Sequence, residues 1–163
     1  MDKKKMIFLI SMLLVVIIIF GILIYFTYLQ KEKSNATITI SLNELVEQIK
    51  NTDEFDYSKM QDVDTDFASS TFLIDKDKMQ EIIGKIPLVN TKASMFVIIK
   101  TNNENLQDTK LALESYAAEY ETQWANYLPD QYELVKERKI GILGNYVYMI
   151  VSESPDKIIK LIK

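Results

Sequence analysis

An uninterrupted apolar segment near the N-terminus constrains this chain more than any other feature. Residues 6–29 carry no charge, and seventeen of these 24 residues are Leu, Ile, Val or Phe. As an α-helix with a rise of about 1.5 Å per residue, the segment would be about 36 Å long, enough to cross a hydrocarbon core of about 30 Å. A soluble core helix would need a polar face, which this segment lacks. We therefore predict one transmembrane helix over residues 6–29.

The charges that flank this segment predict its orientation. The tail 1–5 contains three lysines, and only Lys31 and Lys33 follow the segment closely. Because lysines favour the cytoplasmic side, we expect the tail inside and the C-terminal part outside a single-pass cell-membrane protein. The segment is longer than the apolar region of about 7–15 residues in a cleaved signal peptide, so we favour an uncleaved signal-anchor. Cleavage near Ser34-Asn35-Ala36 is the alternative.

The rest of the chain is predicted to be a polar linker over 30–40 and one mildly acidic domain over 41–163, which is enough for one ordinary domain and not two. The chain has 19 basic and 23 acidic residues, of which 16 and 22 lie beyond residue 29, and Arg138 is the only arginine. Nucleic-acid binding depends on clustered basic side chains, so we expect no nucleic-acid partner.

Apolar periodicity and turn residues predict an α+β fold for the domain. A continuous apolar run predicts a central strand over 94–100, and residues 140–152 predict a hairpin with a tight turn at Gly144-Asn145. If Asn145 takes the positive φ of such a turn, Asn145→Val should destabilise the domain by about 1 kcal/mol. The long periodic segment 104–127 predicts an amphipathic helix covering a mostly antiparallel sheet. The remaining predictions are helices over 42–50, over 76–83 with an end at Gly84, from Pro129 through Val135 and from Pro155 onward, a strand over 72–74, and a loop over 51–70.

Missing residue types exclude most familiar catalytic and metal sites. The chain has no cysteine and no histidine, so thiolate nucleophiles, imidazole bases and metal sites built from these ligands are excluded. A sortase needs both residues and is excluded with them. An anchored signal peptidase is excluded because no Ser-x-Met-Pro stretch is present. We expect no catalytic residue, no cofactor and no bound metal.

One acidic motif resembles a calcium-binding loop. Asp62, Asp64 and Asp66 match its first three ligand positions, at which alternating carboxylates converge on a hard cation. The sixth position is Phe67 where such a loop has Gly, and the twelfth is Leu73 where it has a bidentate Glu. The closing ligand is therefore missing, and we expect a solvated acidic loop.

Two further patterns have structural explanations that we favour over functional ones. Ser154 and Lys157 match the Ser-x-x-Lys pattern of penicillin-binding enzymes, but no Lys-Thr-Gly or Ser-Asp-Asn partner occurs, so we expect Ser154 to cap a helix. Aromatic residues of the long helix and the hairpin could form a binding surface, but packing between helix and hairpin is the favoured role. These aromatic residues are Tyr116, Tyr120, Trp124, Tyr127, Tyr132, Tyr146 and Tyr148.

The C-terminal part of the chain resembles a known family. The segment from the long helix through Tyr127-Leu128-Pro129-Asp130-Gln131 and Leu134 to the hairpin at 140–152 is similar to small domains of unknown function in Gram-positive bacteria. These domains occur on secreted proteins, lipoproteins and membrane-anchored proteins, and the resemblance covers roughly residues 40–163. It implies α+β character and a location outside the cytoplasm, and it brings no active-site residue. The chain lacks the lipid-modified cysteine of the lipoprotein members and has an apolar helix instead.

The functional hypothesis that follows is a membrane-anchored extracytoplasmic protein with a non-catalytic binding or accessory role in the cell envelope. Its partners would be the lipid bilayer, through the N-terminal helix, and an envelope protein or cell-wall polymer. The alternative is an envelope hydrolase that uses Asp or Glu carboxylates such as Asp64 or Glu119, because carboxylates and Ser-Lys pairs are the only general acid-base groups left. A pair of carboxylates facing one cleft would distinguish the two.

Overall fold

The computed structural model describes residues 12–25 and 41–162, and the chain divides into two units between Asn35 and Ala36. In the first unit, residues 12–25 form an α-helix and are all exposed. Within the described residues, no helix has both the length and the apolar character that crossing a membrane requires. The predicted span 6–29 extends past the described residues at both ends, and the predicted tail 1–5 and the whole linker 30–40 lie outside them.

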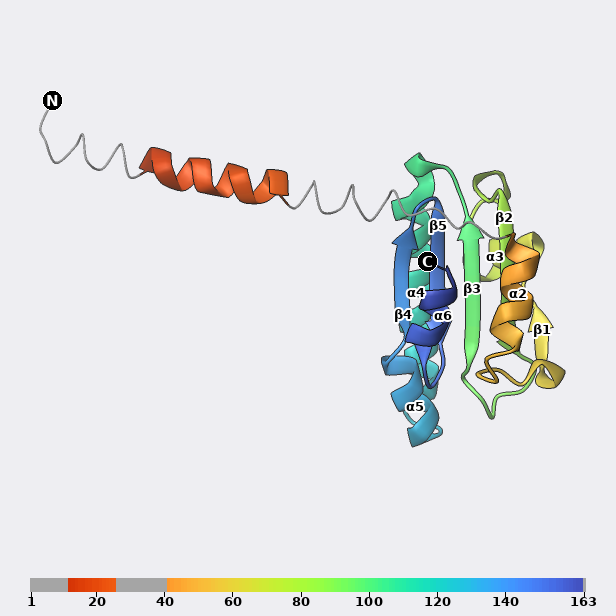
Figure 1. Cartoon of the computed structure of the whole chain (residues 1–163). Helices are drawn as coiled ribbons and strands as arrows, with labels where there is room; N and C mark the ends of the chain where they lie inside the picture. The colour runs from red at the N-terminus through yellow and green to blue at the C-terminus, as the bar shows by residue number, and fades with distance from the viewer. Residues whose placement is uncertain (1–11, 26–40, 163) are drawn as a thin grey trace, which may run out of the picture. The chain divides into compact units, whose positions relative to one another are not determined.

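The second unit is built on a five-stranded antiparallel sheet with the strand order β1-β2-β3-β5-β4 (Figure 1). The predicted α+β class with a mostly antiparallel sheet is confirmed. The strands are β1 (Met60–Asp62), β2 (Glu81–Pro87), β3 (Met95–Lys100), β4 (Lys139–Leu143) and β5 (Tyr146–Val151). The described α-helices of this unit are α2 (Leu42–Lys50), α3 (Thr65–Thr71), α4 (Leu106–Trp124), α5 (Pro129–Lys136) and α6 (Pro155–Ile162), and 3₁₀ turns span Tyr57–Lys59, Lys76–Lys78 and Asn103–Asn105.

Helices cover both faces of the sheet. The strand β3 is central, as predicted, and its alternate residues point to opposite faces. Val97 and Ile99 belong to a core that includes residues of α3, α4 and α5, whereas Phe96 and Ile98 belong to a second core with α2 and α6. Figure 1 shows α2 and α6 in front of the sheet and α4 behind it. The long helix therefore covers one face, as predicted, and two short helices cover the other.

The starts of three helices follow the predictions closely. The helix α2 begins after Ser41, whose Oγ accepts a hydrogen bond from the Glu44 N–H at 3.2 Å. The first residues of α5 and α6 are Pro129 and Pro155, where the missing proline N–H costs nothing. The long helix begins two residues later than predicted, because a 3₁₀ turn precedes it, and ends three residues earlier, because residues 125–127 form a turn.

Two predictions between residues 51 and 74 are wrong. The segment 51–70, predicted as a loop, contains β1 and α3, and Asp64 is the N-cap of α3, where it accepts a hydrogen bond from the Phe67 N–H at 2.7 Å. The segment 72–74, predicted as a strand, is not one. Phe72 and Ile74 are buried around an exposed Leu73, so this short stretch has the alternation of a strand without a partner strand.

A third prediction, the helix over 76–83 ending at Gly84, is also wrong, because this stretch leads through a 3₁₀ turn into β2. Ile82 and Ile83 are β-branched and suit the pleated surface of a strand. Gly84 lies within β2, where a Cβ atom would be 2.8 Å from the carbonyl oxygen of Phe96. This glycine therefore permits close packing and ends no helix.

The tight turn of the hairpin is confirmed, but the residue with positive φ in this turn is Gly144 and not Asn145. Gly144 has a φ of 57°, and Asn145 is not among the described residues with positive φ. Glycine at the first of two turn residues is typical of a type II′ hairpin turn. The expectation for Asn145→Val is corrected accordingly, since Asn145 does not need a left-handed backbone.

Candidate functional site

An open groove of about 600 Å³ lies beside the short edge strand β1. On one side α2 contributes Asn43, Val46 and Glu47, whose spacing places them on one side of the helix. The other side is formed by the end of β1 and the start of α3, and the apolar floor comes from β2 and Phe96. This volume lies within the range of about 300–1,000 Å³ that small-ligand sites occupy.

A largely buried lysine is held between two partners in this groove. The Lys85 side chain is 16% exposed, and its Nζ lies 2.9 Å from Asp62 Oδ1 and 5.3 Å from the centre of the Tyr57 ring. The Tyr57 hydroxyl donates a hydrogen bond to the Val46 carbonyl at 3.4 Å. Burial, with the charges of Glu47 and Asp62, raises the pKa of Tyr57 to about 12. The phenol is therefore neutral at physiological pH, and the lysine charge is matched by Asp62.

Two more carboxylates lie on opposite sides of the groove. Glu47 on α2 is exposed and forms no ion pair within the described part of the chain. Asp64, also exposed, caps α3 through the Phe67 N–H. Because Lys85 balances the charge of Asp62, Glu47 and Asp64 give the groove its net negative charge. This charge favours a ligand that carries a cationic group.

The groove also exposes an unpaired part of β2. The strand β1 pairs with β2 over Met60–Asp62, and the Val63 N–H then donates to the Gly84 carbonyl at 3.0 Å before the chain enters α3. Alternate residues of a strand direct their backbone groups to the same edge. The N–H and C=O of Ile82 thus face the same edge as the Gly84 carbonyl. No strand in the described ranges pairs with Ile82 on that edge.

Comparison with known proteins identifies a family for most of this unit. Residues 53–152 match a domain of unknown function, DUF4358, and this match covers more than half of the chain. The chain belongs to the DUF4358 family. No curated protein and no solved structure matches the chain. The DUF4358 region includes all five strands with α3, α4 and α5, so it supplies the floor and one side of the groove. The other side, on α2, precedes the family region.

The three aspartates of the calcium-like motif do not converge in the DUF4358 domain. Asp62 pairs with Lys85, Asp64 caps α3, and Asp66 pairs with Lys76. Among the described residues, no group of three or more Asp or Glu side chains is placed to hold a metal ion. The motif runs from a strand into a helix, which separates its side chains, and the expected acidic loop is not formed.

Ser154 and Lys157 both contact Glu54 at the start of α6. The Ser154 N–H donates to Glu54 Oε2 at 3.0 Å, and Lys157 Nζ lies 2.7 Å from Oε1. Burial raises the pKa of the Glu54 carboxyl, but the hydrogen bonds and charge of these two partners outweigh burial and leave the pKa below its usual value. Lys157 is thus engaged by a carboxylate, and Ser154 directly precedes the first residue of α6, which is the position of an N-cap. The capping hydrogen bond of its hydroxyl stays a prediction. Sequence reasoning missed Glu54 because it lies 100 residues from Ser154.

The aromatic residues of α4 form a row of ring contacts that extends into the core. Tyr116 lies 4.8 Å from Phe72 and 5.8 Å from Tyr120, between ring centres, and Trp124 lies 5.9 Å from Tyr120. Burial raises the pKa of Tyr116 to about 12. Of the seven aromatic residues proposed as a surface, Tyr127 is 57% exposed and the rest are buried or half-buried. The structure therefore favours packing over a binding surface, but Tyr146 and Tyr148 of the hairpin pack in the core with α2 and α6 and not against α4.

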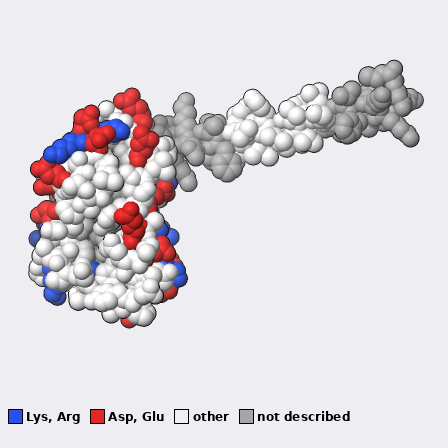
Figure 2. All heavy atoms as spheres, turned by 180° about the vertical axis from the view of Figure 1, so that it is seen from behind, with Lys and Arg blue, Asp and Glu red and all other residues white. Residues whose placement is uncertain are grey.

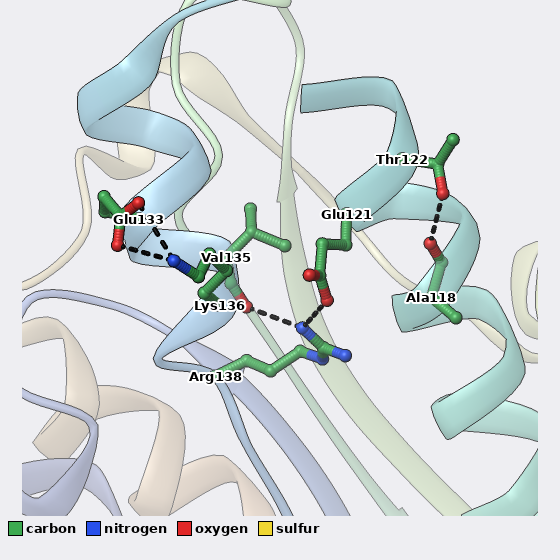
Figure 3. Close-up of polar contacts among 7 residues, drawn as sticks. All are labelled: Ala118, Glu121, Thr122, Glu133, Val135, Lys136 and Arg138. Carbon is green, nitrogen blue, oxygen red and sulfur yellow. Dashed lines mark hydrogen bonds and ion pairs between the residues drawn. The ribbon is translucent and has the colours of Figure 1, made fainter. Parts of the chain in front are cut away.

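The single arginine has a structural position. Arg138 Nη1 donates to Glu121 Oε2 at 2.6 Å and to the Val135 carbonyl at 3.0 Å, and it ties α4 to the connection between α5 and β4 (Figure 3). Lys136 beside it pairs with Glu133. On the face seen in Figure 2, basic side chains are interspersed with acidic ones around a broad uncharged region. This face therefore presents no basic patch of the kind that binds phosphate backbones.

Proposed function

We propose that the chain is a membrane-anchored, extracytoplasmic protein whose DUF4358 domain is a non-catalytic binding or accessory module in the envelope of a Gram-positive bacterium. The anchor is supported by the uncharged segment 6–29 after a lysine-rich tail, and by the exposed apolar helix over 12–25. The lipid bilayer is one partner through this helix. An envelope protein or cell-wall polymer is the other, and it contacts the groove.

The groove is the observation that carries the binding role. It combines an apolar floor, an open strand edge and charged side chains around an accessible mouth. A carboxylic acid that donates a proton in catalysis usually sits in an apolar, water-excluding pocket. The Asp62 side chain is 83% exposed, and Glu47 and Asp64 are exposed as well. These features suit recognition of a ligand better than its chemical conversion.

A hydrolase is the second candidate, because Glu47, Asp62 and Asp64 line the same groove. Glu119, the other carboxylate considered, lies on α4 and does not line it. The test is turnover of peptide, ester, phosphate or glycan substrates by purified protein. We expect none. Turnover that is lost in Glu47→Gln or in Asp64→Asn, which keeps a side chain that can cap α3, would replace binding with catalysis.

Photo-crosslinking in cells tests the binding role. A photoreactive amino acid at Asn43 of the full-length chain lies in the groove, and the same group at Gln107 is exposed on α4 outside it. We expect light-dependent adducts with an envelope protein or wall polymer from position 43 and few from position 107. Equal adducts from both positions, or none from position 43, would contradict the proposal.

A further inference from the structure

We propose that the groove binds an extended peptide segment with basic side chains, which pairs as an added strand with the open edge of β2 at Ile82. This proposal rests on the proposed binding function and names its ligand class. Addition of a strand to an exposed sheet edge is a common mode of peptide recognition, in which backbone hydrogen bonds give affinity and side-chain contacts give specificity.

The open edge has the length and the backbone groups for a short strand. The strand β2 begins at Glu81, but β1 reaches only to the position opposite Lys85, and the Val63–Gly84 bond is the last backbone hydrogen bond between these two described segments before α3. Residues 81–83 therefore offer roughly 10 Å of edge at about 3.4 Å per residue. Ile82 directs both its N–H and its C=O to this edge. A peptide strand would satisfy both groups in place of water.

The walls suit the alternating side chains of an extended peptide. Successive side chains of a strand point to opposite faces of a sheet. On the face covered by α2 the groove is lined by Val46 and Ile83, and on the opposite face by Ile82, and all three side chains are half-buried and so partly accessible. An added strand therefore finds apolar surface on both faces.

Charge complementarity selects a basic peptide. Glu47 lies on the α2 side of the groove, and Asp64 lies at the start of α3 on the other side. Lys85 is paired with Asp62 and largely buried, so it does not offset these two carboxylates. A lysine or arginine side chain on either face of the peptide would meet one of them, whereas an acidic peptide would be repelled.

The first experiment measures affinity with defined peptides. Full-length protein in detergent micelles is titrated into a fluorophore-labelled, amidated Val-Lys-Val-Lys-Val peptide and its glutamate counterpart, and fluorescence anisotropy is read. We expect the lysine peptide to bind and the glutamate peptide not to bind. Glu47→Gln and Asp64→Asn should each weaken binding by about two- to fivefold, the range of exposed ion pairs. Glu44→Gln removes the same charge from α2 outside the groove and should leave affinity unchanged.

The second experiment locates the peptide by amide hydrogen exchange. The Ile82 amide should exchange rapidly in the free protein and at least tenfold more slowly with the lysine peptide bound. Ile86, which pairs with Gln61 of β1, should not change. Absence of binding, equal binding of both peptides, or binding without protection of Ile82 would each overturn the proposal. Protection that rises with protein concentration alone would also overturn it, because a second copy of the chain would then occupy the edge.

The in-cell crosslinks separate this proposal from the proposed function. If the peptides fail but Asn43 still gives specific adducts, the ligand class is wrong and the binding role stands. If both fail, the binding role fails as well.

Discussion

Replacement of Gly84 by alanine should destabilise the domain by a predictable amount. The added methyl would lie 2.8 Å from the Phe96 carbonyl oxygen and 3.0 Å from Val63 Cβ, closer than the optimum of about 3.5–4.0 Å between non-bonded carbon atoms. Both obstacles are fixed to the backbone, so neighbouring strands must move. Overpacking of this kind costs about 1–3 kcal/mol, and replacing a strand glycine recovers about 0.5–1 kcal/mol. Because neither obstacle can swing aside, we take the upper half of the overpacking range, about 2–3 kcal/mol, and subtracting about 1 kcal/mol leaves a net loss of about 1–2 kcal/mol.

Urea denaturation of a protein comprising residues 36–163 measures this loss. Trp124 is the only tryptophan and is 4% exposed, so its fluorescence reports unfolding of the core. With a slope of about 2 kcal/mol per molar urea, the midpoint should fall by roughly 0.5–1 M.

Gly141→Ala is the matched control, because the same substitution in β4 meets a different obstacle. Its methyl would lie 2.5 Å from the Tyr148 hydroxyl, which is the far end of a half-buried side chain that can swing aside. Its cost should therefore be smaller. An unchanged midpoint for Gly84→Ala, or an equal loss for both variants, would refute the reasoning about backbone-fixed contacts.

Three further predictions follow from other parts of the chain. Gly144→Val should lower stability by about 1–3 kcal/mol, because a β-branched residue resists the positive φ, whereas Asn145→Val should change stability little. The opposite order of urea midpoints would contradict the turn assignment. Glu54→Gln should lower stability at pH 7 by about 1–3 kcal/mol, because the carboxylate accepts hydrogen bonds from Ser154 and Lys157. The pKa of Glu54 is lower in the folded than in the unfolded state, so the stabilisation by its carboxylate is present above the unfolded pKa and is lost as pH falls through the folded pKa. The stability difference between wild type and Glu54→Gln should therefore shrink in acid. A stability difference that does not vary with pH would exclude the ionised carboxylate as its source. Full-length protein should remain with membranes after an alkaline carbonate wash, and a released species that begins near Thr37 would show cleavage. Residues 36–163 alone should unfold in one cooperative transition, and several transitions would show that the domain boundary is misplaced.

The sequence anticipated those elements that have strong local signals. The strand β3 contains a run of five apolar residues, which marks a strand buried on both faces. Ser41 marks a helix start through its side-chain hydroxyl, and Pro129 and Pro155 through their fixed backbone. The strand β1 has three residues, too few for a periodic pattern, and Asp64 fits two sequence patterns at once, a calcium ligand and a helix N-cap.

The groove was beyond the reach of sequence patterns. Its lining residues come from 43–47, 62–65, 82–85 and Phe96. These segments lie together because β1 pairs with β2 and because α2 packs on the face of the sheet to which the Phe96 side chain points. The contact of Glu54 with the start of α6 likewise joins distant segments. Sequence reasoning did name carboxylates facing one cleft as the decisive feature, but the identity of the three that line the groove, Glu47, Asp62 and Asp64, depends on tertiary packing.

Cysteine labelling on intact spheroplasts tests the central claim most directly, because the chain has no cysteine of its own. Single-cysteine variants Asn43→Cys, in the groove, and Gln107→Cys, on α4 outside it, are treated with a membrane-impermeant maleimide in spheroplasts and as purified protein. An extracytoplasmic domain with an occupied groove predicts labelling of Gln107→Cys at similar rates in both preparations, and much slower labelling of Asn43→Cys in spheroplasts than in purified protein. Labelling of Gln107→Cys only after lysis would contradict the location, and equal rates for Asn43→Cys in both preparations would contradict an occupied groove.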